Sequence, residues 1–250
     1  MAAKRRNARS RSSRVSRAPV RCPVRRRPCR VGTAQRRDGL ARRGDPAEYR
    51  HSGRHSAMTT PFVLVHADES CLGNDSTKPS RGGNAALIEA PAGDSVARWD
   101  FYECSPQTTN NKMALAGAIA ALEWIRRQWR HALVHFVSDS EYLVKGMQEW
   151  RKDWKARGWR RKTGPLENAD LWQKLDQVDG AHTVEWRWVR GHNEHVKNEY
   201  ANALAIRAAD QQERSNGLIP SGFDTWLAQQ RARGKYMDFD PDKELHERSK

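Results

Sequence analysis

The chain has 250 residues, of which 37% are hydrophobic and 30% are charged, and its formal net charge is +15. This length predicts one domain with extensions or two small domains. The four cysteines, at positions 22, 29, 71 and 104, form no C-x-x-C pair and lie near no histidines at zinc spacing, which argues against a disulfide framework and a structural zinc site. The longest apolar stretch, 113–125, is too short to span a bilayer. We therefore expect reduced thiols, no membrane segment and a cytoplasmic location.

The net positive charge of the chain comes from the N-terminal segment. Residues 1–57 carry 18 Lys or Arg against 3 Asp or Glu, whereas residues 58–250 carry 27 of each. The segment has few aliphatic residues and one aromatic residue, Tyr49, so it cannot bury enough apolar surface to offset its ordering entropy. Three interpretations stay open: a basic arm that contacts phosphates, a transit peptide, or translated upstream sequence before a true start at Met58.

From Phe62 onward the hydrophobic pattern predicts alternating strands and helices. We expect strands over 62–67, 85–90, 96–103, 134–137 and 183–189. We expect helices over 110–129, from 140 onward, over 168–178 and over 198–212. This order is typical of an α/β protein with a mixed sheet and helices on its faces. The remaining residues, 213–250, read as a polar C-terminal tail with at most a short helix around Trp226, and we assign it no function.

Three short strings contain candidate functional residues: ADESCLGN at 67–74, VSDS at 137–140 and VRGH at 189–192. The first two each place an aspartate, Asp68 or Asp139, at the end of a strand-like run, and the third places His192 on a glycine loop. Each residue alone would be an ordinary turn or cap residue. Two carboxylates brought together at strand ends, however, are ligands for hard divalent cations, which usually act on phosphates.

Further strings extend the pattern: TNNKM at 109–113, the tryptophan-bearing stretch 150–159, NADLW at 168–172, and Asn198-Glu199. In this order they resemble type 1 ribonuclease H, the bacterial-style enzyme that cuts the RNA strand of RNA/DNA hybrids. The resemblance covers about 62–209. It implies a ribonuclease H-like fold, a five-stranded mixed sheet flanked by helices, over a domain at 58–212. It also implies one or two divalent cations, Mg²⁺ or alternatively Mn²⁺, as cofactor.

The resemblance assigns roles to individual positions. Four family carboxylates hold two Mg²⁺ ions, and Asp68 and Asp139 match two of them as metal ligands. His192 matches the loop histidine that moves protons or helps product leave. The third and fourth acid positions hold Ala114 and Asn202. Because Asn202 can still coordinate through its amide oxygen whereas Ala114 offers no ligand, we expect a weak second metal site and reduced or lost activity.

Two other acids are candidates to replace the missing carboxylates. Glu69 stands where the family has glycine, and Glu141 follows Asp139 by two residues near a helix start. Strand alternation predicts that Glu69 points away from the face that Asp68 uses. We expect both glutamates to be surface charges.

A basic stretch from 145 to 162 holds eight Lys or Arg against two acids, with three tryptophans interleaved. One interpretation is that the tryptophans are core residues and the cations a solvated face; the resemblance implies instead a basic protrusion that grips the DNA strand. Contacts of this kind recognise the shape and 2′-hydroxyls of a hybrid rather than its base sequence. The positions that the resemblance assigns to substrate binding are Asn74, Thr109, Asn110, Asn111, Trp150, Lys152, Lys155 and Trp159.

The sequence thus supports a first hypothesis and two alternatives. The first is a monomeric, metal-dependent endonuclease that binds RNA/DNA hybrids and hydrolyses their RNA strand with weakened activity. The second is a catalytically inactive hybrid- or duplex-binding protein on the same fold. The third, another nuclease or integrase of the same superfamily, is disfavoured by the tryptophan-bearing stretch and by Gly191-His192.

Overall fold

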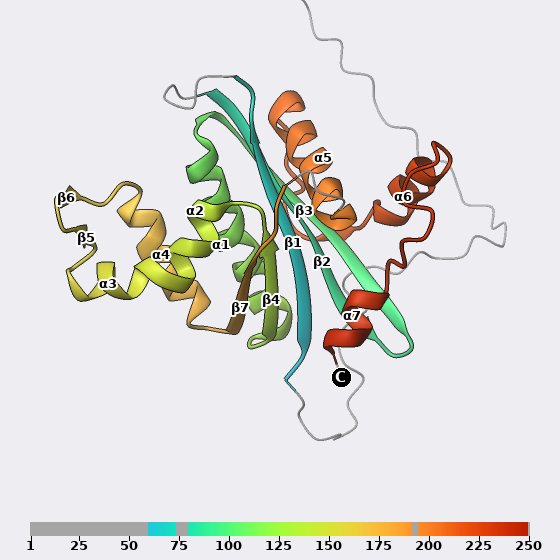
Figure 1. Cartoon of the computed structure of the whole chain (residues 1–250), viewed down its shortest axis with the longest axis horizontal. Helices are drawn as coiled ribbons and strands as arrows, with labels where there is room; N and C mark the ends of the chain where they lie inside the picture. Colours follow the sequence, from blue (N-terminus) through green and yellow to red (C-terminus); the bar gives the residue numbers. More distant parts are fainter. Residues whose placement is uncertain (1–59, 74–79, 192–194, 250) are drawn as a thin grey trace, which may run out of the picture. The chain divides into compact units, whose positions relative to one another are not determined.

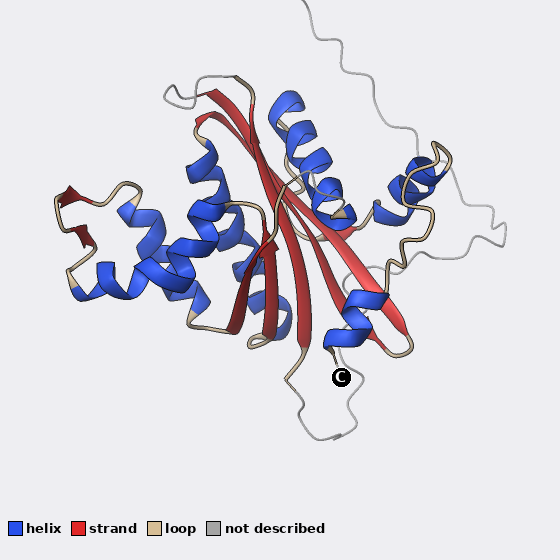
Figure 2. Cartoon of the chain, in the orientation of Figure 1, coloured by secondary structure: helices blue, strands red, loops and turns tan. Residues whose placement is uncertain are grey.

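The computed structural model describes residues 60–73, 80–191 and 195–249. These form a mixed sheet with helices on both faces (Figures 1 and 2). The strands are β1 (Phe62–Cys71), β2 (Ser80–Ala92), β3 (Ser95–Thr108), β4 (Leu133–Ser138), β5 (Arg160–Arg161), β6 (Gly164–Pro165), β7 (Thr183–Trp188) and β8 (Ile219–Pro220). The helices are α1 (Asn110–Trp129), α2 (Glu141–Lys145), the π-helical turn η2 (Gly146–Trp150), α3 (Arg151–Ala156), α4 (Ala169–Asp179), α5 (Val196–Gln211), α6 (Phe223–Arg231) and α7 (Lys243–Arg248).

The main sheet has the strand order β7-β4-β1-β2-β3-β8. Strand β1 runs antiparallel to β2 and parallel to β4, and β4 runs parallel to β7. The last paired residues of β1 and β4 are Ala67 and Ser138, so β1 continues past the end of its neighbour. Because β1 and β4 are parallel, the residues that follow Ala67 and Ser138 meet at the same edge of the sheet.

Helices α1 and α4 cover one face of the sheet. The helix α1 begins where the sequence predicts, since the Thr109 hydroxyl caps it by accepting a hydrogen bond from the Lys112 amide at 3.4 Å. Its Leu115 and Leu122 are fully buried against Val63 and Val65 of β1. The two-residue alternation of β1 gives this face its apolar surface.

Helices α5, α6 and α7 cover the opposite face. Tyr200 of α5 and Phe223 of α6 pack with Leu87 of β2, and Leu245 of α7 packs with Leu64 of β1. None of the helices in the described ranges is both long enough and apolar enough to cross a membrane.

The sheet differs from the predicted one in the number and the length of its strands, and β1 and β3 extend to Cys71 and Thr108, past the predicted ends at 67 and 103. It has six strands rather than five, because the two-residue strand β8 pairs with Trp99 and Asp100 at the edge of β3. Strand β2 begins at Ser80 rather than at 85, although glycines usually mark loops. The reason lies in packing: a Cβ on Gly83 would overlap the backbone of α5, so glycine lets the helix approach the strand closely.

Candidate active site

Three acidic side chains meet at the edge of the sheet where β1 and β4 end. Asp68 and Glu69 belong to β1, and Asp139 directly follows β4. One carboxylate oxygen from each of the three lies within 4.8 Å of the others. This is the only cluster of at least three potential metal-ligating side chains among the residues that the structure describes.

Burial and mutual repulsion disfavour the charged forms of these acids. Burial, followed by the charge of Asp139, raises the pKa of Asp68 to about 8, against opposing hydrogen bonds from the Glu69 amide and from Asn198. Burial and then the charges of Asp68 and Asp139 raise the pKa of Glu69 well above its usual range. Crowded carboxylates of this kind need a cation if all of them are to be ionised at neutral pH.

The expectation that Glu69 is a surface charge is wrong, because its carboxylate lies in the acidic cluster. Alternation does place Glu69 on the α1 face, with Ala67, and Asp68 on the α5 face. However, β4 ends at the level of Ala67, so on that side of β1 no strand separates the two faces beyond this residue, although β2 still pairs with β1 on the other side. The longer glutamate side chain therefore reaches around the edge of β1 to Asp68 and Asp139, and it accepts a hydrogen bond from Ser140.

The other candidate acid, Glu141, lies outside the cluster. It begins α2, its side chain is 57% exposed, and its carboxylate lies 3.5 Å from the Lys145 ammonium one helical turn later. This is the surface charge that the sequence predicts.

The two positions without acids lie on the helices that flank the site. Ala114 of α1 is 4% exposed and belongs to the same buried cluster as Ala67. Asn202 of α5 is partly buried and lies one turn after Asn198. An acid that could take the place of the family's acid at Ala114 therefore lies on the α1 face, namely Glu69.

Asn198 contacts the site, although sequence reasoning gave it no role. Its side-chain amide donates hydrogen bonds to the Asp68 carboxylate at 3.1 Å and to the Ala67 carbonyl at 3.3 Å. The available signal was its spacing of four from Asn202, which places both residues on one face of α5. The partner of Asn198 lies 130 residues away in the sequence, so the spacing alone could not identify it.

Two further residues hold Asp139 in place. The indole N–H of Trp188, at the end of β7, donates a hydrogen bond to the Asp139 carbonyl at 2.9 Å. Gly191 lies so close to the Asp139 carboxylate that a Cβ at this position would overlap it. The glycine before His192 is therefore required by the close approach of a neighbouring carboxylate.

Two of the predicted site residues, Asn74 and His192, lie outside the described residues. Three others lie at the start of α1: Thr109 is its N-cap, Asn110 is exposed and Asn111 is partly buried. Their roles in substrate binding stay predictions.

The basic stretch runs from the end of α2 through η2 and α3 to β5, which pairs with β6, and α3, β5 and β6 project to one side in Figure 1. Trp154 is buried against Trp172 with ring centroids 5.1 Å apart, and Trp150 and Trp159 are partly buried against the same core. Lys152 is exposed, whereas the Lys155 ammonium lies 2.7 Å from the Asp176 carboxylate. The tryptophans are thus partly core residues, and the exposed cations form a separate face.

The donor set suits a hard divalent cation. Asp68, Glu69 and Asp139 offer carboxylate oxygens, which Mg²⁺ and Mn²⁺ prefer over nitrogen or sulfur. Burial and the charge of Asp139 raise the pKa of Asp68, and a bound cation would favour its ionised form. The residues present therefore fit the cofactor that the sequence predicts.

Comparison with known proteins agrees with this geometry. The model of the RNase H family matches residues 60–210. Ribonuclease H of Cupriavidus necator is 41% identical over 149 residues, which cover 59% of this chain and 95% of that protein. Ribonuclease HI of Caulobacter vibrioides is 43% identical over 147 residues, which cover 58% and 91%.

Among solved structures, the chain is similar to LC9-RNase H1, described as a type 1 RNase H with the type 2 active-site motif. The two are 47% identical with a TM-score of 0.65, over 69% of this chain and 83% of that one. The chain belongs to the RNase H family.

Proposed function

We propose that this protein is a ribonuclease H that hydrolyses the RNA strand of RNA/DNA hybrids, with Glu69 as the third carboxylate of its metal site. The observation that carries the proposal is the cluster of Asp68, Glu69 and Asp139 at the sheet edge. Glu69 approaches from the α1 face, where Ala114 leaves the site without an acid. The family's third carboxylate is thus supplied by a neighbouring strand residue instead of by the helix.

The charges of the site decide how much activity to expect. Two divalent cations carry four positive charges, and Asp68 with Asp139 would leave two of them uncompensated. Counting Glu69 reduces this shortfall to one charge. We therefore propose an active enzyme that requires a higher metal concentration than a site with four carboxylates would.

Each residue then has a defined task. Asp68, Glu69 and Asp139 would hold the cations, and the amide oxygen of Asn202 would add a neutral ligand. Bound cations would neutralise the scissile phosphate and orient it for hydrolysis. Asn198 fixes the Asp68 carboxylate from one side, while Trp188 and Gly191 fix Asp139 from the other. His192 would move a proton near the phosphate, as the family resemblance implies.

Hybrid binding follows from the exposed cations of the basic stretch and from the start of α1. Lys152 and Lys155 would contact phosphates, and Thr109, Asn110 and Asn111 would contact the backbone and the 2′-hydroxyls. Trp150 and Trp159 would contribute through their exposed edges. Such contacts read the shape of the duplex, so we propose cleavage without base specificity.

The test is cleavage of a hybrid with a labelled RNA strand by the full chain, in Mg²⁺, in Mn²⁺ and in EDTA. Single-stranded RNA and duplex DNA are the substrate controls, and Asp139→Asn is the protein control. The proposal predicts metal-dependent cutting of the hybrid alone, lost in the control variant. The missing acids at Ala114 and Asn202 favour the second candidate, a hybrid-binding protein without activity. That candidate predicts retained hybrid binding and no cutting in either metal.

A further inference from the structure

The C-terminal segment 213–249 lies beyond residue 210, where the family match ends. It crosses the α5 face of the sheet, and α6 and α7 lie on that face in Figure 1. Phe223 and Leu245 are fully buried, and Leu245 packs against Leu64 and Val137. The segment is therefore part of the folded structure and covers the side of β1 from which Asp68 projects.

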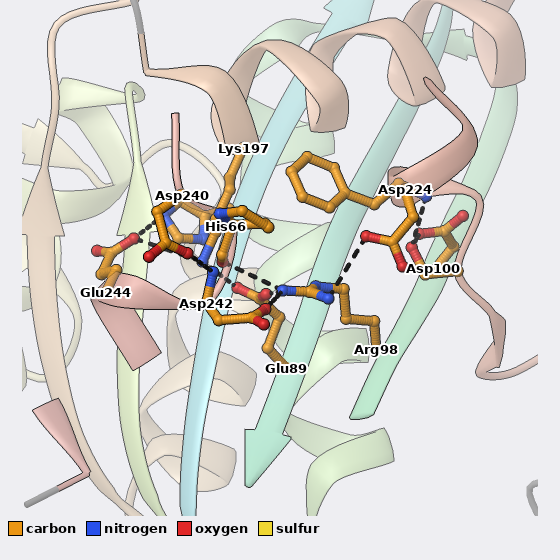
Figure 3. A network of polar contacts seen from close by, with 12 residues as sticks. His66, Glu89, Arg98, Asp100, Lys197, Asp224, Asp240, Asp242 and Glu244 are labelled. Carbon is orange, nitrogen blue, oxygen red and sulfur yellow. Dashed lines mark hydrogen bonds and ion pairs between the residues drawn. The ribbon is translucent and has the colours of Figure 1, made fainter. Parts of the chain in front are cut away.

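Beneath this segment the sheet carries a buried arrangement of charges (Figure 3). Glu89 of β2 is fully buried, with one carboxylate oxygen 2.8 Å from the Arg98 guanidinium and the other 2.7 Å from the Lys197 ammonium. Lys197, in the first turn of α5, is itself 3% exposed. Within the sheet and α5, one carboxylate thus faces two cations, and buried charges without sufficient partners are costly.

The C-terminal segment adds three further carboxylates near Lys197 and Arg98. The Glu244 carboxylate lies 3.8 Å from the Lys197 ammonium and 3.2 Å from His66 Nε2. Asp242 bonds the Arg98 guanidinium, and Asp224 lies 3.5 Å from it. Docking of the segment therefore adds carboxylate partners to Lys197 and Arg98, which share only Glu89 within the sheet and α5.

The same segment also holds the other side of the first turn of α5. The Tyr236 hydroxyl donates a hydrogen bond to the Glu199 carboxylate. Lys197 and Glu199, the immediate neighbours of Asn198, thus both contact the C-terminal segment, while Asn198 itself donates to Asp68. On the strand side, Glu244 contacts His66, two residues before Asp68.

We propose that residues 213–249 are a positioning element for the active site. Through Glu244 and Tyr236 they fix the first turn of α5, and this turn holds Asn198 on the Asp68 carboxylate. The orientation of Asp68 toward a metal ion then depends on a segment that contributes no ligand. The consequence for metal binding rests on the proposed function, whereas the effect on the Asn198–Asp68 hydrogen bond does not.

The test uses the full chain with Glu244→Gln and Tyr236→Phe combined. The matched control is Glu247→Gln, which removes an acid three residues further along α7 that pairs only with Lys243 at the surface among the described residues. Three quantities are measured: the Kd for Mn²⁺ by calorimetry, the side-chain amide signals of Asn198 by ¹⁵N NMR, and the melting temperature. We expect the double variant to raise the Kd about 10-fold, in the range found for residues that orient metal ligands, and to shift the Asn198 signals. The control keeps the parental values.

A second variant separates positioning from general stabilisation. Asn198→Ala alone raises the Kd for Mn²⁺, and adding the double variant to it produces no further rise, because both changes break the same hydrogen bond. Additive effects in this cycle overturn the proposal. A lower melting temperature with unchanged Kd and unchanged Asn198 signals also overturns it, since the segment then only stabilises the fold. If the double variant does not fold, Tyr236→Phe alone is measured in the same way.

Failure of the proposed function gives a different pattern. A parental chain that neither binds Mn²⁺ nor cuts the hybrid refutes the metal-dependent activity. The Asn198 amide signals still decide the positioning claim in that case: a shift in the double variant supports it, and unchanged signals overturn it.

Discussion

At the scale of single residues, the site consists of carboxylate side chains that meet where the pairing of two parallel strands, β1 and β4, ends. Asp68 and Asp139 could be predicted from the sequence because each follows a strand-like run within a recognisable string. The position of Glu69 could not be predicted, because strand alternation does not say how far a side chain reaches where β4, one of the two neighbouring strands, has ended. Asn198 was missed because its hydrogen bond to Asp68 joins residues 130 positions apart.

The contact between Gly191 and Asp139 leads to a prediction about orientation. In Gly191→Ala the new methyl group overlaps the Asp139 carboxylate and turns it out of the metal site. We expect cleavage to fall about 10- to 100-fold while the circular dichroism spectrum stays parental. Gly180→Ala is the control, since a Cβ there makes only ordinary contacts at 3.5 Å and beyond. Equal cleavage rates for the two variants would show that Gly191 does not constrain Asp139.

At the scale of elements, the sequence predicts the helices and strands of 62–212 well because local signals mark them. The Thr109 cap and the buried leucines of α1 are such signals. Strand β8 and helix α7 were not predicted, since two paired residues and one buried Leu245 leave almost no periodicity. Their positions depend on contacts with β1 and β3 that lie far away in the sequence.

Helix α3 carries two exposed lysines, Lys152 and Lys155, whose contributions to hybrid binding can be compared. Lys152 is exposed and makes no ion pair within the described part of the chain, whereas Lys155 is held by Asp176. For hybrid binding, Lys152→Gln should reduce the slope of log Kd against log salt by about 1, as expected for one lost phosphate contact. Lys155→Gln should reduce it less, because Asp176 already neutralises part of that charge. Fluorescence anisotropy over a salt series measures both slopes, and a larger effect for Lys155 would contradict this assignment.

At the scale of the whole domain, the packing of the C-terminal segment on the α5 face involves ion pairs with buried charges. The polar composition of 213–249 did not predict these ion pairs. The sequence shows a polar tail, and only the structure shows that three of its acids face Arg98 and Lys197. Long-range ion pairs leave no spacing pattern in a sequence. The sequence of the C-terminal segment therefore predicts a polar tail, although Phe223, Leu227 and Leu245 are buried.

This charge arrangement predicts how stability depends on pH. Burial alone would raise the pKa of Glu244, but the hydrogen bond and charge of His66, with Lys197 and Arg248, lower it to about 2 from an ordinary 4.5. A lowered pKa stabilises the fold above pH 4.5, and this contribution is lost as the pH falls from 4.5 toward 2. Because the Glu244 side chain is 35% exposed, solvent screening reduces the contribution to about 1 kcal/mol.

Urea unfolding at pH 7, 5 and 3 measures this effect. Glu244→Gln should lower the free energy of unfolding by about 1 kcal/mol at pH 7 and 5, and the difference from the parental chain should shrink at pH 3. Glu247→Gln should match the parental chain at every pH. A difference for Glu244→Gln that does not change with pH would show that its charge contributes nothing to the docking of α7.

The most direct test of the account is the rate of hybrid cleavage by Glu69→Gln at saturating Mg²⁺, beside the parental chain and Glu141→Gln. Removing a residue that only orients a metal ligand lowers activity by about 100-fold at most. If Glu69 is the third carboxylate, the cleavage rate of Glu69→Gln falls by more than this, and Glu141→Gln keeps the parental rate. In the Glu69→Gln background, Ala114→Glu should return part of the activity, because it places an acid on the same face of the site. Parental cleavage by Glu69→Gln would contradict the account, since the protein would then work with Asp68 and Asp139 as its only carboxylates in the described site.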